Sequence, residues 1–133
     1  MNAQTVPIPK GRGEKILLVE DDVSILRLSE RILQTHGYTV LSATTPADAL
    51  AQARQQGGRL DLLFTDVVMP EMNGRELANQ VQVFFPECKV LFMSGYTADI
   101  IAHRGVLDEG VHFIQKPFSS LDLATAVQKV LNT

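Results

Sequence analysis

The sequence predicts an α/β fold in which helices cover both faces of a parallel sheet. Five short apolar runs begin at residues 15, 38, 61, 88 and 111, and segments with helical periodicity lie between them. Most of these runs are almost wholly apolar, as expected for strands buried on both faces. The segments between the runs differ from one another, which excludes a repeat array. This alternation is typical of a doubly wound, three-layer sandwich.

The first strand is expected at Lys15–Val19, in the run KILLV. A helix should follow from Val23 to His36, because apolar residues recur there at helical spacing and Gly37 is a typical stop. Its expected inward positions are Ile25, Leu28, Ile32 and Leu33.

The second strand is expected at Tyr38–Leu41, and the second helix should begin at Thr45-Pro46. Proline is favoured in the first turn because its missing N–H would have no partner there. The inner face of this helix would carry Ala49, Leu50 and Ala53, and Gly57-Gly58 would end it.

The third strand is expected at Asp61–Thr65 and the fourth at Cys88–Met93. Between them, a helix is expected from about Gly74 to Phe84, with Pro86 beyond its end. Leu77, Val81 and either Phe84 or Phe85 should point inward.

The last part of the chain predicts a short, weak helix at about Ala98–Arg104, interrupted by Gly105, and a fifth strand at Val111–Ile114. A final helix should be capped by Ser119 or Ser120 and end near Leu131. Its expected inward residues are Leu123, Val127 and Val130.

Composition excludes several classes of protein. The chain has 133 residues, 45% of them hydrophobic and 20% charged, which fits one globular domain. A net charge of −3 offers no basic footprint for nucleic acid and no polybasic patch for a membrane. No apolar run approaches the ~18 residues of a membrane span. One cysteine, Cys88, excludes an internal disulfide and is expected to be a buried structural thiol, so the expected compartment is the cytoplasm.

The first 14 residues are expected to be a flexible arm or interdomain linker, with the folded domain at 15–133. The stretch MNAQTVPIPKGRGEK lacks the apolar core of a secretory signal. Its helix and strand breakers are Pro7, Pro9, Gly11 and Gly13.

Polar residues gather where the predicted strands end, which is where open parallel sheets bind ligands. Strand one is followed by Glu20-Asp21-Asp22, strand three by Asp66, strand four by Ser94 and strand five by Lys116. Strands one and three would be neighbours if the strand order reverses beside strand one, the usual switch point. Each residue alone has an ordinary structural explanation, but the whole set indicates a functional site.

The acids would repel one another unless a cation binds them. Asp22 is expected to cap the helix that starts at Val23. The remaining acids, Glu20, Asp21 and Asp66, are the hard oxygen ligands that Mg²⁺ prefers. Because a carboxylate can attack phosphorus to give an aspartyl phosphate, Asp66 is the best candidate nucleophile. Lys116 and Ser94 would bind phosphoryl oxygens.

Four motifs together resemble the receiver domain of two-component response regulators. They are ILLVEDD, DLLFTDVVMPEMNG, VLFMSGY and FIQKPF, and the resemblance covers residues 15 to 131. It implies a (βα)5 flavodoxin-like fold with strand order 2-1-3-4-5. The stretches LFMSGYT and RGVLDEGVHFIQKPFS further resemble the C-terminal receiver of a hybrid sensor histidine kinase, although a freestanding receiver remains an alternative.

The resemblance implies a role for each site residue. Asp66 would be the phosphoacceptor, and Asp21 would bind Mg²⁺, or Mn²⁺ in its place, directly. Glu20 would act through water, and the backbone carbonyl of Val68 would be the third protein ligand.

The remaining roles implied by the resemblance concern activation. Ser94 would hydrogen-bond the phosphoryl group and move together with Phe113, which stands where many members have tyrosine. Lys116 matches the family's lysine, and the peptide bond before Pro117 is usually cis in the family, as the small penalty for cis X–Pro allows.

The implied partner is a histidine kinase or a histidine-phosphotransfer domain that donates a phosphoryl group. The surface made by segments 98–104, 111–114 and 119–131 would then change and could also support a homodimer. The isolated domain would be a phosphoacceptor and not an enzyme.

Three rival interpretations remain. A phosphatase of the haloacid dehalogenase type needs a second acid two residues after its nucleophile, where this chain has Val68. A flavodoxin-like nucleotide-binding domain needs a phosphate loop after strand one, where this chain has acids. A pseudo-receiver that only binds proteins would not need the intact set of Asp21, Asp66, Ser94 and Lys116.

Overall fold

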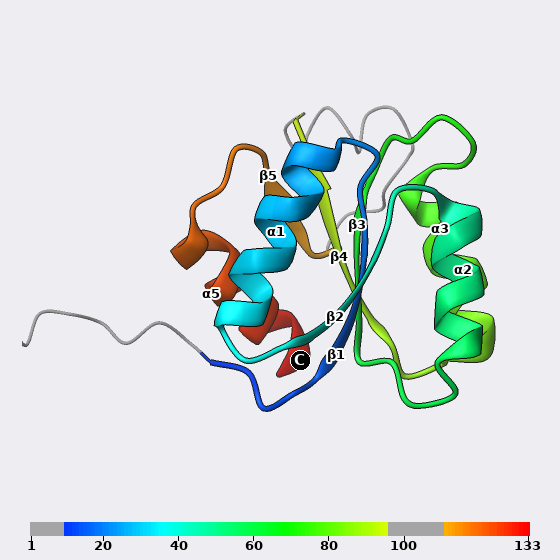
Figure 1. Ribbon diagram of the computed structural model, residues 1–133, viewed down its shortest axis with the longest axis horizontal. Helices are drawn as coiled ribbons and strands as arrows, with labels where there is room; N and C mark the ends of the chain where they lie inside the picture. Colours follow the sequence, from blue (N-terminus) through cyan, green and yellow to red (C-terminus); the bar gives the residue numbers. More distant parts are fainter. Residues whose placement is uncertain (1–9, 96–110) are drawn as a thin grey trace, which may run out of the picture.

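The computed structural model describes residues 10–95 and 111–133, which form one parallel sheet flanked by helices (Figure 1). The strands lie in the order β2-β1-β3-β4-β5. Their bounds are β1 Lys15–Val19, β2 Thr39–Ala43, β3 Leu62–Asp66, β4 Lys89–Ser94 and β5 Phe113–Gln115. The predicted doubly wound fold and its 2-1-3-4-5 order are confirmed, and the strand ends differ from the prediction by at most two residues.

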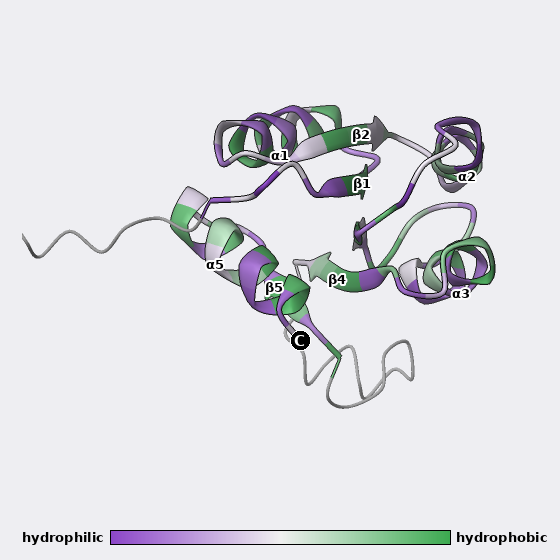
Figure 2. Ribbon diagram, turned by 90° about the horizontal axis from the view of Figure 1, so that it is seen from below, coloured by the Kyte–Doolittle hydropathy of each residue, from purple (hydrophilic) through white to green (hydrophobic). Residues whose placement is uncertain are grey.

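Helices cover both faces of the sheet. In Figures 1 and 2, α1 and α5 lie on one side of the strands and α2 and α3 on the other. Their bounds are α1 Val23–Thr35, α2 Pro46–Gln55, α3 Gly74–Phe84 and α5 Ser120–Leu131. The helix predicted at 98–104 lies outside the described residues. The layers agree with the prediction for the described part of the chain.

The core consists of two apolar layers, one on each face of the sheet. Successive side chains of a strand point to opposite faces. Ile16 and Leu18 of β1 therefore join the layer under α1 and α5, whereas Leu17 and Val19 join the layer under α2 and α3. All four side chains are fully buried. Burial on both faces explains why the strand sequences are continuously apolar rather than alternating.

The structure corrects one predicted core position, Leu28, and decides between Phe84 and Phe85, which the sequence left open. Leu28 is 53% exposed, because the buried stripe of α1 passes through Leu26, Ser29 and Leu33 at spacings of three and four. Phe84 is 51% exposed, whereas Phe85 packs against the core under α2 and α3. Serine at the centre of the α1 stripe removed the apolar signal that would have set the register of this helix correctly.

The helices begin at side-chain caps, as several predictions required. The Asp22 side chain accepts hydrogen bonds from the N–H groups of Ser24 and Ile25 at 2.9 and 3.2 Å. Thr45 caps α2 one residue before Pro46. Ser119, rather than Ser120, caps α5. A cap satisfies N–H groups that the helix itself cannot pair, so these residues determine where each helix starts.

Candidate functional site

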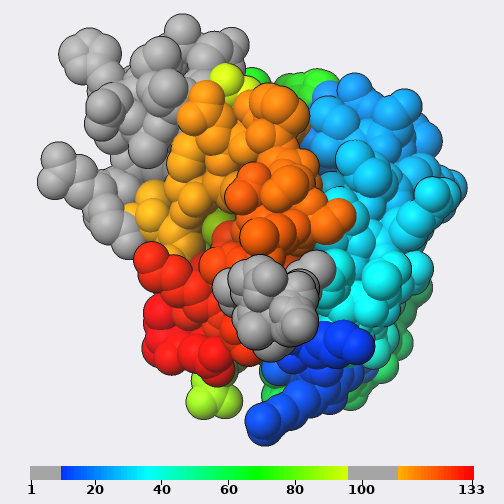
Figure 3. All heavy atoms as spheres, turned by 90° about the vertical axis from the view of Figure 1, so that its left-hand side faces the viewer, coloured from blue at the N-terminus to red at the C-terminus, as the bar shows by residue number. Residues whose placement is uncertain are grey.

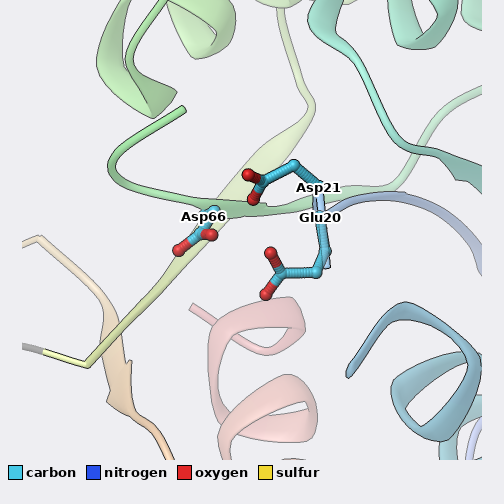
Figure 4. Close-up of side chains that lie close together, drawn as sticks. All are labelled: Glu20, Asp21 and Asp66. Atoms are coloured by element: carbon cyan, nitrogen blue, oxygen red, sulfur yellow. The ribbon is translucent and has the colours of Figure 1, made fainter. Parts of the chain in front are cut away.

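Three carboxylates converge at the carboxyl ends of β1 and β3. Glu20 and Asp21 directly follow β1, and Asp66 is the last residue of β3. β1 pairs with β3, and Val19 lies opposite Thr65, so the two strand ends are adjacent. Each acid offers one oxygen within 4.8 Å of the others, and Figure 4 shows the three side chains close together. The predicted acidic cluster is therefore present, and its oxygen ligands could hold a hard divalent cation.

The cluster is unfavourable without a cation. Glu20 is 1% exposed and Asp66 is 7% exposed, whereas Asp21 is exposed. Burial, followed by the neighbouring Asp66, raises the pKa of Glu20. Loss of solvation, followed by Glu20, raises the pKa of Asp21. Both carboxyl groups therefore hold a proton more readily in the folded protein than in the unfolded chain.

Lys116 provides the positive charge inside this group. Its Nζ lies 2.5 Å from Glu20 Oε1 and 3.2 Å from Asp66 Oδ2. Burial alone would lower the pKa of Lys116, but the hydrogen bond to Glu20 and the charges of both acids outweigh it and raise that pKa. Lys116 is therefore a cation that bridges two buried carboxylates. The peptide bond from Lys116 to Pro117 is cis, as the resemblance implied.

Ser94 and Phe113 lie on the neighbouring strands. Asp66 pairs with Met93 in the register of β3 and β4, which puts Ser94 one residue beyond this pair, 3% exposed. Phe113 begins β5, pairs with Phe92 and packs half-buried against the core under α2 and α3. Ser94 thus lies with the acids at the carboxyl ends of the strands, whereas Phe113 lies farther from these ends, at the start of β5.

Val68 lies just past the acidic cluster in the chain. Val67 donates its N–H to the Met93 carbonyl at 3.0 Å, which keeps the chain in line with β4 past the end of β3. Val68 is 56% exposed, and because its apolar side chain has no ligand atom, only its backbone carbonyl could bind a metal ion. Its role as a metal ligand stays a prediction.

The structure adds two features that the sequence motifs did not indicate. The Glu20–Lys116 pair is closer than the Asp66–Lys116 pair, and the motifs did not indicate which acid Lys116 would contact more closely. Gly74, the first residue of α3, lies directly against the backbone of β3, and its N–H donates to the Val67 carbonyl at 2.7 Å. The sequence did contain a signal for this close approach, because a helix rarely needs glycine at its first position unless a side chain would clash there.

Replacing Gly74 with alanine is expected to destabilise the fold by about 2 kcal/mol. A Cβ there would overlap the carbonyl oxygen of Asp66 and lie 3.2 Å from a ring carbon of Phe92. The backbone of β3 or α3 must therefore shift. Urea unfolding measures the loss. Gly58→Ala is the matched control, because its Cβ would meet only the ends of the Gln56 and Lys15 side chains. Equal stabilities of the two variants would contradict the expected clash.

The acidic cluster predicts that stabilisation by Mg²⁺ depends on pH. Because their pKa values are raised, Glu20 and Asp21 contribute stability that is present at low pH and lost as the pH rises through their folded pKa values. Mg²⁺ must compete with these protons. At pH 7.5 and a concentration about 100 times its Kd, it should raise the free energy of unfolding by about 2.7 kcal/mol.

This increment should shrink as the pH falls toward the ordinary carboxyl pKa of about 4. Denaturant unfolding with and without Mg²⁺ across this range provides the test, and Asp21→Asn is the control that should reduce the increment at every pH. An increment that is constant with pH would contradict proton competition at the cluster.

Comparison with known proteins identifies the family of this chain. The family model described as the response regulator receiver domain matches residues 16–128. The chain belongs to this family. The function class expected from the four motifs, a receiver domain of two-component systems, is therefore confirmed. The comparisons give the phosphatase alternative no support.

Two proteins of Brucella abortus (strain 2308) are similar to this chain. The sensor kinase CckA is 40% identical over 116 residues, which cover 87% of this chain and 12% of that protein. The response regulator receiver protein CpdR is 32% identical over 118 residues, which cover 89% of this chain and 97% of CpdR. The chain therefore matches a small part of a long kinase and nearly all of a short receiver protein.

Solved structures agree with this assignment. The receiver domain from the hybrid histidine kinase CckA has a TM-score of 0.73 and 33% identity, covering 88% of this chain and 98% of that one. The chemotaxis protein CheY4 of Vibrio cholerae has a TM-score of 0.78 and 29% identity, and the match covers 89% of this chain and 98% of that one. Among the described residues, no helix has the length and apolar character needed to cross a bilayer.

Proposed function

We propose that Asp66 accepts a phosphoryl group from a phosphohistidine on a histidine kinase or a histidine-phosphotransfer domain. The observation that carries this proposal is the convergence of Glu20, Asp21 and Asp66 around Lys116 in a chain of the receiver family. Asp66 is the best acceptor because it ends the central strand β3, with β1 on one side and β4 on the other.

The acidic cluster fits a Mg²⁺ ion, or Mn²⁺ in its place. Asp21 and Asp66 would bind the ion directly together with the Val68 carbonyl, and Glu20 would bind it through water. A bound ion supplies positive charge opposite the phosphoryl oxygens. This assignment is supported by the three converging carboxylates. Burial first, and the neighbouring carboxylates second, raise the pKa values of Glu20 and Asp21, and a bound cation would favour the charged form of both groups.

The transfer itself needs few groups from this chain. An oxygen of the Asp66 carboxylate forms a bond to phosphorus while the N–P bond to the donor imidazole breaks, and the electron pair of that bond stays on the imidazole nitrogen. Lys116 Nζ, 3.2 Å from Asp66 Oδ2, is placed to pair with a phosphoryl oxygen. The hydroxyl of Ser94, at the adjacent strand end, donates a hydrogen bond to another.

Phosphorylation then changes the surface of the domain. The phosphoryl group adds negative charge, about −1.5 to −2 on phosphorylated side chains in general, and it draws Ser94 and Lys116 toward it. Phe113, which lies half-buried between the core and the surface, moves inward as Ser94 moves. The surface that includes β5 and α5 thereby shifts between two populations, and it is also the surface for a homodimer.

The isolated domain accordingly acts as a phosphoacceptor in the cytoplasm, without contacts to nucleic acid or membrane. Its relatives offer two settings, a receiver within a long sensor kinase and a receiver protein of similar length. In either setting, the donor that we propose for Asp66 is a phosphohistidine.

Incubation with acetyl phosphate tests this function without a cognate kinase. The purified chain should acquire one acyl phosphate in the presence of Mg²⁺ and none in the presence of EDTA. Intact mass and peptide mapping after trapping the acyl phosphate should locate the group on Asp66. Binding of BeF₃⁻ with Mg²⁺ provides a second measurement that does not depend on turnover. A chain that neither labels nor binds BeF₃⁻ would be the protein-binding pseudo-receiver.

A further inference from the structure

The residues just before β1 contact the α1–β2 turn, which lies at the end of the domain opposite the acidic cluster. The N–H of Gly11 donates to the His36 carbonyl at 2.5 Å, and that of Gly13 donates to the Gly37 carbonyl at 2.8 Å. The Thr39 N–H donates to the Glu14 carbonyl at 3.0 Å. These three backbone bonds run in succession, so residues 10–14 follow the turn between α1 and β2 for their whole length.

Two glycines allow this close approach. A Cβ on Gly11 would overlap the ring of Tyr38, which is 5% exposed. Gly37 has a φ of +91°, which favours glycine, and a Cβ there would lie 2.7 Å from the Gly11 carbonyl oxygen. The backbones of Gly11 and Gly37 therefore pack directly against each other, and Tyr38 fills the space beneath Gly11.

Tyr38 is a second sign that this contact excludes water. Burial, followed by the negative charge of Glu14, raises the pKa of Tyr38. Tyr38 also belongs to the apolar layer under α1 and α5. The segment thus closes one end of a core layer rather than lying on a polar surface.

The position of the contact links it to α1. Parallel strands place their amino ends at one edge of the sheet, and residues 10–14 enter the fold at that edge (Figure 1). In Figure 3 the blue start of the described chain packs against the cyan segment that follows α1. Because α1 is capped by Asp22, beside the acidic cluster, and by His36 at its other end, one helix spans the distance between the two sites.

We propose that residues 10–14 are a docked strap that gives the chain entering the receiver domain one fixed direction. The partner surface is the α1–β2 turn, residues 36–39, and Gly11 is the residue that permits docking. The proposal takes residues 10–14 out of the expected flexible arm. A fixed entry matters most where a receiver occupies a small part of a longer protein, as in the matched sensor kinase. The proposal does not depend on phosphorylation of Asp66.

Limited trypsin digestion tests the strap, because Lys10 and Arg12 are cleavage sites within it. Proteases need an opened segment, so docking should protect the bond after Arg12. Gly11→Val should release the strap and speed cleavage after Arg12 by about tenfold while the rest of the domain stays intact. Gly58→Ala, whose Cβ would meet only the ends of two flexible side chains, should leave the rate unchanged.

Amide hydrogen exchange gives an independent readout in the wild-type chain. The N–H groups of Gly11, Gly13 and Thr39 should be protected, and circular dichroism should show that Gly11→Val keeps its secondary structure. If Gly11→Val fails to fold, protection in the wild-type chain decides the question. Exchange of the Gly11 and Gly13 amides at the rate of an unstructured peptide, or equal cleavage after Arg12 in wild type and variant, would overturn the proposal.

Discussion

Replacing Asp66 with asparagine is expected to reduce phosphoryl uptake from acetyl phosphate to background. Asparagine has nearly the same size and shape, so the carboxyl end of β3 should keep its packing between β1 and β4. Its amide oxygen lacks the negative charge that makes a carboxylate a nucleophile toward phosphorus. The other two acids and Lys116 remain in the variant, so a loss of uptake would show that Asp66 itself is required, and peptide mapping of the labelled wild-type chain would locate the bond on its carboxylate.

The matched control for this experiment is Asp22→Asn. Asp22 adjoins the cluster in sequence but caps α1, and asparagine is an equally good cap. This variant should label like the wild-type chain. Circular dichroism and Mg²⁺-dependent unfolding should show that both variants are folded. Labelling of Asp66→Asn at the wild-type level would exclude Asp66 as the acceptor.

Replacing Lys116 with methionine is expected to have the largest effect on stability. Glu20 is 1% exposed and its closest charge partner among the described residues is Lys116 at 2.5 Å. Removing one partner of a buried ion pair leaves the other charge uncompensated and costs about 3 kcal/mol. Mg²⁺ should recover part of this loss at neutral pH, because the ion supplies positive charge to the same carboxylates. Phosphoryl uptake should fall as well, since no ammonium group remains beside Asp66.

Urea unfolding of Lys116→Met, with and without Mg²⁺, measures this effect. Lys129→Met is the control, because Lys129 is exposed in the last turn of α5 and should cost well under 1 kcal/mol. Adding Glu20→Gln to Lys116→Met should restore stability by removing the orphaned charge. The interpretation fails if Lys116→Met unfolds at the wild-type urea concentration in the absence of Mg²⁺.

The fold was largely predictable because its signals are local. Continuous apolar runs indicated strands buried on both faces, and Asp22, Thr45 and Ser119 marked where helices begin. The prediction of inward-facing residues was wrong where one apolar pattern fits two different buried faces of a helix. Leu28 has helical spacing from Ile32, but the buried stripe of α1 runs through Ser29, a polar residue that burial alone identifies.

The candidate site was predictable in its members but not in its contacts. Glu20, Asp66, Ser94 and Lys116 were named because they follow predicted strands, and parallel strands end at one edge. Which acid Lys116 contacts most closely depends on side-chain geometry between groups 96 residues apart in the chain. The strap is a further case, because Gly11 appears in the sequence only as a breaker, whereas its role depends on the ring of Tyr38.

The sequence by itself determined the family, the order of strands and helices, and the chemical types present at the carboxyl edge of the sheet. These follow from hydrophobic period, capping residues and motifs, each of which is set within a few residues of chain. Only the tertiary structure decided that Lys116 bridges two buried carboxylates, that Gly74 must lack a side chain beside Asp66, and that residues 10–14 lie on the α1–β2 turn. The physical reason is that short-range packing, burial and charge pairing between distant segments exist only after the segments meet.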